Sequence, residues 1–163
     1  QGQTYSEFGL KGTNARWKGF VDGVIKYAHS HFTNQEIYLF GTSSGASWAI
    51  YGSGHKQVSK VVAVSPAFSN EKIKLPDYFI ERTQFVSKEN VVPSFEEMHF
   101  KHPVLLVHGK KDVMVKDEDI YMLYEKLPVG KAYLEFEAEG HCCNYRLSEI
   151  RQKAIEWFAG KWG

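Results

Sequence analysis

Residues 37–52 read IYLFGTSSGASWAIYG, and this stretch decides the fold class. Its first four residues are almost wholly apolar and run into Gly41, a pattern typical of a buried parallel strand. Residues 45–51 are mostly small or apolar and are followed by glycines at positions 52 and 54, which indicates a helix that ends in glycine. The stretch therefore predicts a strand, a tight turn and a helix in direct succession.

The same alternation continues on both sides of this stretch. Upstream, helical spacing predicts a helix over residues 15–32, whose apolar positions are Trp17, Phe20, Val21, Val24, Ile25 and Ala28. Downstream, short apolar runs predict strands over 58–64, 103–107 and 131–136, and helical spacing predicts helices over 116–127 and 146–158. The last helix is expected to bury Leu147, Ile150, Ala154, Ile155 and Phe158.

This order of helices and strands predicts a single α/β domain over residues 1–163. It is expected to be a three-layer sandwich, in which a mostly parallel sheet carries helices on both faces. A chain of 163 residues is long enough to bury a core, and 43% hydrophobic and 24% charged residues exclude a mainly disordered or fibrous protein. Residues 67–102 contain charges and two prolines, and predict loops with one or two short helices.

Charge and cysteine content exclude several classes of partner. Twenty Lys and Arg against nineteen Asp and Glu leave a net charge of +1, so nothing indicates a nucleic-acid or anionic-membrane partner. The longest apolar runs are far shorter than the roughly 20 residues of a membrane span. The two cysteines, Cys142 and Cys143, are neighbours that rarely bridge, which favours a reducing compartment such as the cytoplasm.

The turn after the first predicted strand carries the first candidate for chemistry. Open α/β sheets place their sites at the carboxyl ends of strands, and residues 41–45 there read GTSSG, a match to G-x-S-x-G between a strand and a helix. The glycines are expected to let strand and helix pack closely around a strained serine, and the helix amides to favour negative charge. Only Ser43, not Ser44, has both glycines in register. The alternative is a helix-capping turn.

Two further candidates follow later strands. Asp112 lies in a loop after the third strand, and His141 follows Glu139 and Gly140 after the fourth. Either residue alone is more often a turn residue or an exposed side chain. Together Ser43, Asp112 and His141 all follow strands, in the chain order of one form of the catalytic triad. We therefore expect the three side chains to meet.

These motifs resemble the α/β-hydrolase superfamily over nearly the whole chain. The matching pieces are YLFGTSSGASWAIYG (38–52), KVVAVSP (60–66), PVLLVHGKKDVMV (103–115) and AEGH (138–141). The helix RWKGFVDGVIKYA (16–28) is similar to one in the branch that holds monoacylglycerol lipases and serine aminopeptidases. An α/β-hydrolase fold, incomplete or minimal, is therefore expected.

The resemblance also implies an activity. It implies that Ser43 is the nucleophile, His141 the base and Asp112 the acid, and that the backbone N–H of Ser44 is an oxyanion donor. The expected reaction is cleavage of a small-molecule carboxylic ester through an acyl-enzyme, with esterase or lipase-like activity ahead of thioesterase or peptidase activity. No metal or organic cofactor is expected, and His99 and His102 lack a zinc-site spacing relative to His141.

The irregular segment 67–102 bears on the size of the site. In this superfamily such an insertion builds the cap and the acyl pocket, so its aromatic residues could line a pocket or could simply fill the core. The residues in question are Tyr78, Phe79, Phe85, Phe95 and Met98. The segment is short for a lid, which predicts a small or open site for modest acyl chains.

The chain departs from the family at its N-terminal side. Family members place further strands before the elbow, together with a loop that supplies a second oxyanion donor, whereas Gln1 corresponds to about the loop after their fourth strand. We expect either an upstream segment outside this chain or a second chain, as in a homo-oligomer, to cover the edge of strand 37–40. The alternative function is a hydrolase-fold fragment or pseudo-enzyme that is inactive alone and serves in binding or assembly.

Overall fold

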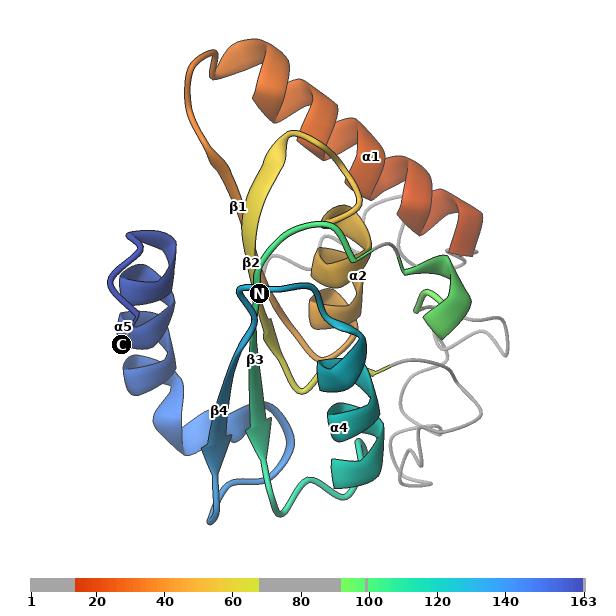
Figure 1. Ribbon diagram of the computed structural model, residues 1–163. Coiled ribbons are helices and arrows are strands. Elements are labelled where there is room, and N and C mark those ends of the chain that lie inside the picture. Colours follow the sequence, from red (N-terminus) through yellow and green to blue (C-terminus); the bar gives the residue numbers. More distant parts are fainter. Residues whose placement is uncertain (1–13, 68–91, 99, 163) are drawn as a thin grey trace.

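The computed structural model describes residues 14–67, 92–98 and 100–162 (Figure 1). The helices are α1 (Asn14–His31), α2 (Ser44–Gly52), α4 (Asp117–Lys126) and α5 (Leu147–Phe158). The strands are β1 (Ile37–Thr42), β2 (Val58–Val64), β3 (Val104–Gly109) and β4 (Ala132–Phe136). Short 3-10 helices cover Phe95–Glu97 and His141–Arg146. The second of these was not predicted.

The four strands form one parallel sheet in the order β1-β2-β3-β4. The register pairs Leu39 with Val61, Val62 with Leu105 and Leu106 with Tyr133. Because all strands run the same way, their carboxyl ends and the loops that follow them lie along one edge of the sheet. The predicted α/β class is confirmed.

Helices cover both faces of this sheet, as expected for three layers. Side chains alternate along β2, so that Val61 faces a core shared with α1, α2 and α4, whereas Val62 faces a core shared with α5. Figure 1 shows the same arrangement, with α5 on one side of the sheet and the other three helices on the opposite side.

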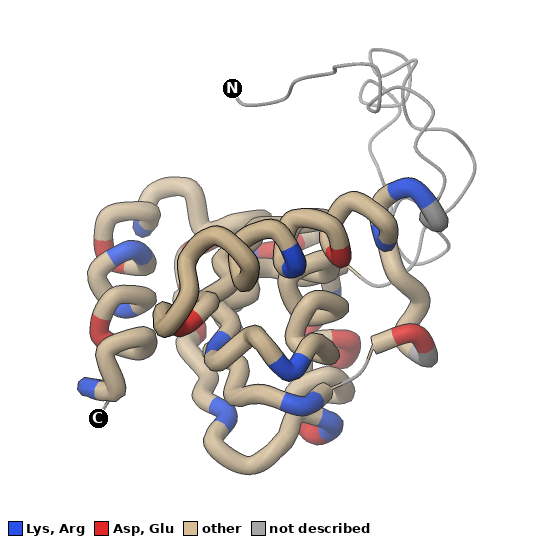
Figure 2. Tube along the Cα trace, turned by 90° about the horizontal axis from the view of Figure 1, so that it is seen from above, with Lys and Arg blue, Asp and Glu red and all other residues tan. Residues whose placement is uncertain are grey.

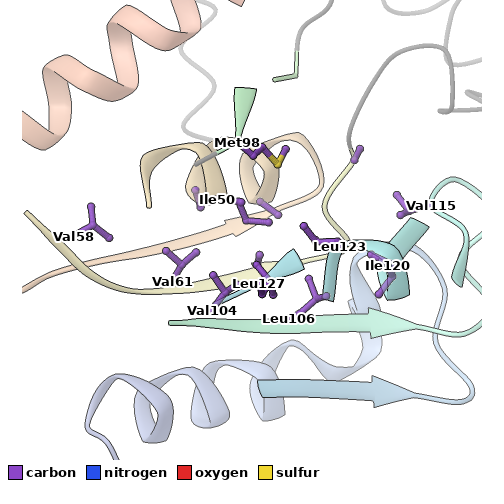
Figure 3. Close-up of a cluster of buried hydrophobic side chains, with 14 of the residues drawn as sticks. Ile50, Val58, Val61, Met98, Val104, Leu106, Val115, Ile120, Leu123 and Leu127 are labelled. Carbon is purple, nitrogen blue, oxygen red and sulfur yellow. The ribbon is translucent and has the colours of Figure 1, made fainter. Parts of the chain in front are cut away.

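The larger of the two cores holds α2 and α4 against the sheet (Figure 3). Ile50 of α2 and Ile120 and Leu123 of α4 are fully buried against Val61 and Leu106 of the sheet. Burying a side chain of this size stabilises the fold by about 1.5–3 kcal/mol. The turns that precede α2 and α4 are therefore held firmly at the carboxyl edge.

The buried face of α5 differs from the prediction at two positions, Ile155 and Trp157. Ile150, Ala154 and Trp157 form its buried stripe at helical spacing, and the Trp157 indole N–H donates to the Val61 carbonyl at 3.1 Å. Ile155 was expected in the core but is 62% exposed. The reason is geometric, because position 155 lies about 100° around the helix from position 154.

Helix α1 also buries less of its predicted face than expected. Ile25 is fully buried, whereas Phe20 and Val24 are 56% and 49% exposed. α1 lies at the end of its layer and packs mainly on α2, where Trp17 stacks on Trp48. Phe20 and Val24 therefore remain largely exposed among the described residues.

Within segment 67–102, several described apolar side chains pack in the core. Met98 is buried in the larger core and Phe95 packs against it, which favours core filling over pocket lining for these two residues. Tyr78, Phe79 and Phe85 lie outside the described residues.

Strand β1 forms one edge of the sheet, as the sequence predicted. In the part of the chain that the structure describes, its outer side pairs with no strand. Phe40 on this strand is 45% exposed. The described part of the molecule thus has an apolar, unpaired edge.

Charges of both signs are distributed over the surface. Figure 2 shows acidic and basic residues interspersed along the helices and loops. None of the helices in the described ranges has the length and hydropathy that crossing a bilayer requires.

Candidate active site

Ser43 occupies the sharp turn between β1 and α2. Its φ of 52° and ψ of −124° are unusual for a residue with a side chain and cost about 1–3 kcal/mol of strain. The Ser43 N–H donates to the Val64 carbonyl at 2.9 Å, and the Ser43 carbonyl accepts from the Ala46 N–H at 3.0 Å. The neighbouring strand and the following helix thus hold this conformation from both sides.

The two glycines that flank the turn have different roles. A Cβ atom on Gly41 would lie 2.1 Å from the Gly45 carbonyl oxygen, so no larger residue fits there. A Cβ on Gly45 meets nothing within 4 Å. The expectation that close packing requires both glycines therefore holds for Gly41 alone.

Asp112 lies in the loop between β3 and α4, and this loop fixes one of its carboxylate oxygens. Oδ1 accepts the N–H groups of Met114 at 2.9 Å and Val115 at 3.0 Å. Burial raises the pKa of Asp112, but hydrogen bonds from His141, Val115 and Met114 lower it more, so the pKa is below its ordinary value. Asp112 is therefore a buried carboxylate whose second oxygen, Oδ2, faces His141.

His141 joins the acid to the serine. Its Nδ1 is 2.8 Å from Asp112 Oδ2, and its Nε2 is 2.8 Å from Ser43 Oγ. Because a carboxylate only accepts, Nδ1 carries the hydrogen of the neutral ring and Nε2 is free to accept from the Ser43 hydroxyl. The structure thus brings Ser43, His141 and Asp112, predicted from three distant parts of the sequence, into one hydrogen-bonded chain.

The surroundings of His141 favour its charged form. Burial lowers the pKa of the ring, but hydrogen bonds to Asp112 and Cys142 outweigh burial and raise the pKa to about 9. A ring with this pKa holds a proton firmly once it has taken one.

The loops that carry Asp112 and His141 touch each other directly. The Lys111 N–H donates to the Glu139 carbonyl at 2.8 Å. A Cβ on Gly109, at the end of β3, would lie 2.5 Å from the same Glu139 oxygen. Glycine at position 109 is therefore what lets the loop of His141 approach the loop of Asp112.

Two buried side chains that sequence reasoning missed also hold the loop of His141. The Ser65 hydroxyl oxygen accepts the Cys142 N–H at 3.1 Å, and Glu139 Oε2 accepts the Tyr145 N–H at 3.3 Å. Ser65 could have been found, because it follows β2 as the three predicted residues follow their strands. No local pattern marks Glu139 as buried.

The adjacent cysteines occupy different environments. Cys143 is fully buried in the smaller core, and burial raises the pKa of its thiol to about 12. Its side chain is therefore a packed thiol in the core. Cys142 is partly exposed beside His141.

The first turn of α2 contains Ser44, the residue whose backbone N–H is the predicted oxyanion donor. Ser44 is the first residue of α2, directly after Ser43. Backbone N–H groups in the first turn of a helix have no intrahelical acceptor and carry partial positive charge. The Ser44 N–H thus belongs to the N-terminal end of a helix that begins directly after Ser43.

Within the described ranges, no group of three or more His, Cys, Asp or Glu side chains is arranged to hold a metal ion. His99 lies outside those ranges.

Comparison with known proteins identifies the architecture. No protein-family model matches the sequence, and no curated protein matches it. An esterase of Pyrococcus furiosus superposes with a TM-score of 0.69 at 22% identity, over 91% of this chain and 62% of the esterase. A monoacylglycerol lipase of Paleococcus ferrophilus superposes with a TM-score of 0.66 at 20% identity, over 94% and 77%. The chain has an α/β-hydrolase fold.

A third structure extends the comparison. An α/β serine hydrolase homologue from Coxiella burnetii superposes with a TM-score of 0.63 at 18% identity, over 93% of this chain and 62% of that protein. The chain thus spans somewhat less than two thirds of the length of the esterase and of this homologue. The expected α/β-hydrolase fold is confirmed.

Proposed function

We propose that the chain is a serine hydrolase that cleaves carboxylic esters with Ser43, His141 and Asp112. The observation that carries the proposal is the continuous chain from Ser43 Oγ through the two His141 nitrogens to Asp112 Oδ2, with both hydrogen bonds at 2.8 Å. Its α/β-hydrolase fold, shared with proteins described as esterases and a lipase, agrees with this chemistry.

In the first half of the proposed reaction, Ser43 Oγ attacks the ester carbonyl carbon. His141 Nε2 takes the hydroxyl proton as the new C–O bond forms, and Asp112 stabilises the resulting imidazolium. The tetrahedral intermediate then collapses, its bond to the alkoxy oxygen breaks, and His141 returns the proton to the departing alcohol. Ser43 is left as an acyl ester.

Water repeats the sequence in the second half. His141 Nε2 removes a proton from water as its oxygen attacks the acyl-enzyme carbonyl carbon. Collapse of that intermediate breaks the bond to Ser43 Oγ, which recovers its proton from His141. The products are a carboxylic acid and an alcohol, and the three residues return to their starting state.

We propose that the carbonyl oxygen lies at the start of α2, where the Ser44 N–H donates to the developing negative charge. Removing one oxyanion donor from a hydrolase costs on the order of 10²–10³ in turnover. If the chain works with Ser44 alone, its turnover is expected to be low by about that factor. A segment or chain that contributes a second donor is expected to raise it.

Hydrolysis of short p-nitrophenyl esters tests the proposal. Ser43→Ala is expected to abolish turnover because it removes the nucleophile. Ser44→Ala is the matched control, since it keeps the backbone N–H and leaves Ser43 in place, and it is expected to retain turnover. Turnover that is unchanged in Ser43→Ala contradicts the proposal. Thioesters and amides of the same acyl group then separate esterase from thioesterase and peptidase activity.

The unpaired edge of β1 favours a second candidate function. With Phe40 exposed and no strand paired to the outer side of β1 in the described ranges, the chain could be an inactive binding or assembly module that docks through this edge. An active, monodisperse monomer in sedimentation contradicts this second candidate. An inactive chain that gains activity on adding a partner supports it.

A further inference from the structure

A second histidine–carboxylate pair lies at the two ends of the loop that carries Asp112. His108 in β3 places its Nε2 2.9 Å from Oδ1 of Asp117, the first residue of α4. The loop over residues 110–116 is thus closed by a side-chain hydrogen bond between the strand before it and the helix after it.

This hydrogen bond is specific to one nitrogen of His108. Because the Asp117 carboxylate only accepts, Nε2 carries the hydrogen and donates it. The other nitrogen, Nδ1, is buried and has no hydrogen-bond partner within the described part of the molecule. The histidine side chain is fully buried, so Asp117 is the one polar group shown to hold it. Removing the partner of such a group carries a desolvation cost of about 1–3 kcal/mol.

Short-range hydrogen bonds connect Asp112 with the start of α4. Inside the loop, Asp112 is tied to Met114 and Val115 by its Oδ1, and the Lys116 carbonyl accepts the Ile120 N–H at 3.2 Å in the first turn of α4. The segment from Asp112 to the helix therefore moves largely as a unit. A shift of the start of α4 relative to β3 displaces Asp112 Oδ2 from His141 Nδ1.

We infer that His108 and Asp117 are positioning residues for the acid of the proposed triad. Neither lies in the hydrogen-bonded chain of Ser43, His141 and Asp112, and both act through the loop that holds Asp112. The inference rests on the proposed function for its kinetic consequence, although the geometric link itself is testable without turnover.

The kinetic test compares three variants of the first turn of α4. Asp117→Ala removes the acceptor, Asp117→Asn keeps an amide oxygen that can accept from His108, and Glu118→Ala removes an exposed carboxylate of the same turn. The Asp117 side chain is 39% exposed, so these changes are compatible with folding. Asp117→Ala is expected to lower kcat by about tenfold with KM nearly unchanged, because misplacement by 1 Å costs up to about 10².

Two controls distinguish loss of the His108–Asp117 hydrogen bond from loss of a negative charge at the N-terminus of α4. Asp117→Asn is expected to restore most of kcat, and Glu118→Ala to match the wild type. An equal loss in Glu118→Ala assigns the effect to charge at the helix N-terminus and overturns the inference. A loss in Asp117→Asn as large as in Asp117→Ala also overturns it.

A measurement on the resting protein keeps this test independent of activity. The His141 Nδ1 proton that bonds to Asp112 is expected to give a downfield proton NMR signal. We expect Asp117→Ala to shift or broaden this signal and to speed amide exchange of residues 112–115, while Glu118→Ala leaves both unchanged. Unchanged spectra and exchange in Asp117→Ala overturn the inference. Absence of wild-type turnover with these changes present overturns the proposed function and leaves the positioning link standing.

Discussion

At the scale of single residues, the site depends on a few backbone positions that allow loops to approach one another. Gly41 leaves room for the Gly45 carbonyl, and Gly109 leaves room for the Glu139 carbonyl. Ser43 adopts a positive φ in the turn after Gly41. These backbone features let the loops that carry Ser43, Asp112 and His141 come close enough for the three side chains to form hydrogen bonds. Their loss is therefore expected to affect the site more than the core.

The two elbow glycines are expected to respond differently to the same change. Gly41→Ala forces a Cβ into the Gly45 backbone and is expected to unfold the elbow and destabilise the protein by several kcal/mol. Gly45→Ala enters open space and is expected to change the free energy of unfolding by less than about 1 kcal/mol. Urea unfolding of both variants checks this, and equal destabilisation contradicts the assigned roles.

The rate of the proposed reaction is expected to rise with pH up to about 9. His141 must be neutral to accept the Ser43 proton, and its pKa is raised to about 9. A pH profile of kcat/KM checks this, and a plateau already reached near the ordinary histidine pKa of about 6.5 contradicts it. Asp112→Asn removes a negative charge and is expected to shift the rise to lower pH and to slow turnover.

The contribution of His141 to the free energy of unfolding is expected to fall with rising pH, whereas the rate rises. Because the folded-state pKa of His141 lies above its unfolded value of about 6.5, its contribution to stability is complete below that pH. The contribution is lost as pH rises through about 9. Urea unfolding of the wild type and His141→Gln checks this, and a difference between the two that stays constant from about pH 6 to about pH 10 contradicts it.

Sequence reasoning found the residues that follow strands, because the ends of parallel strands meet at one edge. Ser43, Asp112 and His141 were found in this way. Glu139 and the His108–Asp117 pair were not, because their hydrogen bonds join segments whose proximity no local spacing records. The conformation of Cys142, with a φ of 63°, was equally invisible in the sequence.

At the scale of elements, α5 shows where periodicity alone is insufficient. Leu147, Ile150, Ala154, Ile155 and Phe158 all fit helical spacing, yet the buried stripe is completed by Trp157. Contacts with the sheet determine which face of α5 is buried, because Trp157 packs in the smaller core and donates to the Val61 carbonyl in β2. Helix and strand boundaries were otherwise predicted to within a few residues.

Substitutions at positions 155 and 157 of α5 are therefore expected to change the stability of the fold by very different amounts. Trp157→Ala is expected to destabilise the fold by about 3–5 kcal/mol, because it removes a buried side chain and its hydrogen bond. Ile155→Ala is expected to change stability by about 0.5 kcal/mol or less, since that side chain is exposed. Denaturant unfolding compares them, and a similar loss in both variants contradicts the assignment.

At the scale of the whole molecule, the unpaired edge of β1 has a consequence for association. Phe40 on the edge and Phe20 and Val24 on α1 are exposed apolar side chains. Exposed edges and apolar patches promote pairing with another chain. We propose that this chain associates through β1, with itself or with a further segment or partner.

Sedimentation velocity over a concentration series tests this proposal. The sedimentation coefficient is expected to rise with concentration, and Phe40→Lys is expected to suppress the rise, because a charge on an edge strand opposes pairing. Val129→Lys is the matched control, since Val129 is 97% exposed in the turn before β4. A concentration-independent monomer, or equal suppression by the control, contradicts self-association through β1 and leaves association with a further segment or partner.

The most direct test of the central claim is intact-mass measurement after exposure to a fluorophosphonate probe. An activated Ser43 attacks the phosphorus atom, displaces fluoride and gains one covalent adduct. The account predicts a single adduct on the wild type and on Ser44→Ala, and none on Ser43→Ala. A folded wild-type chain that gains no adduct, or an adduct that persists in Ser43→Ala, contradicts it.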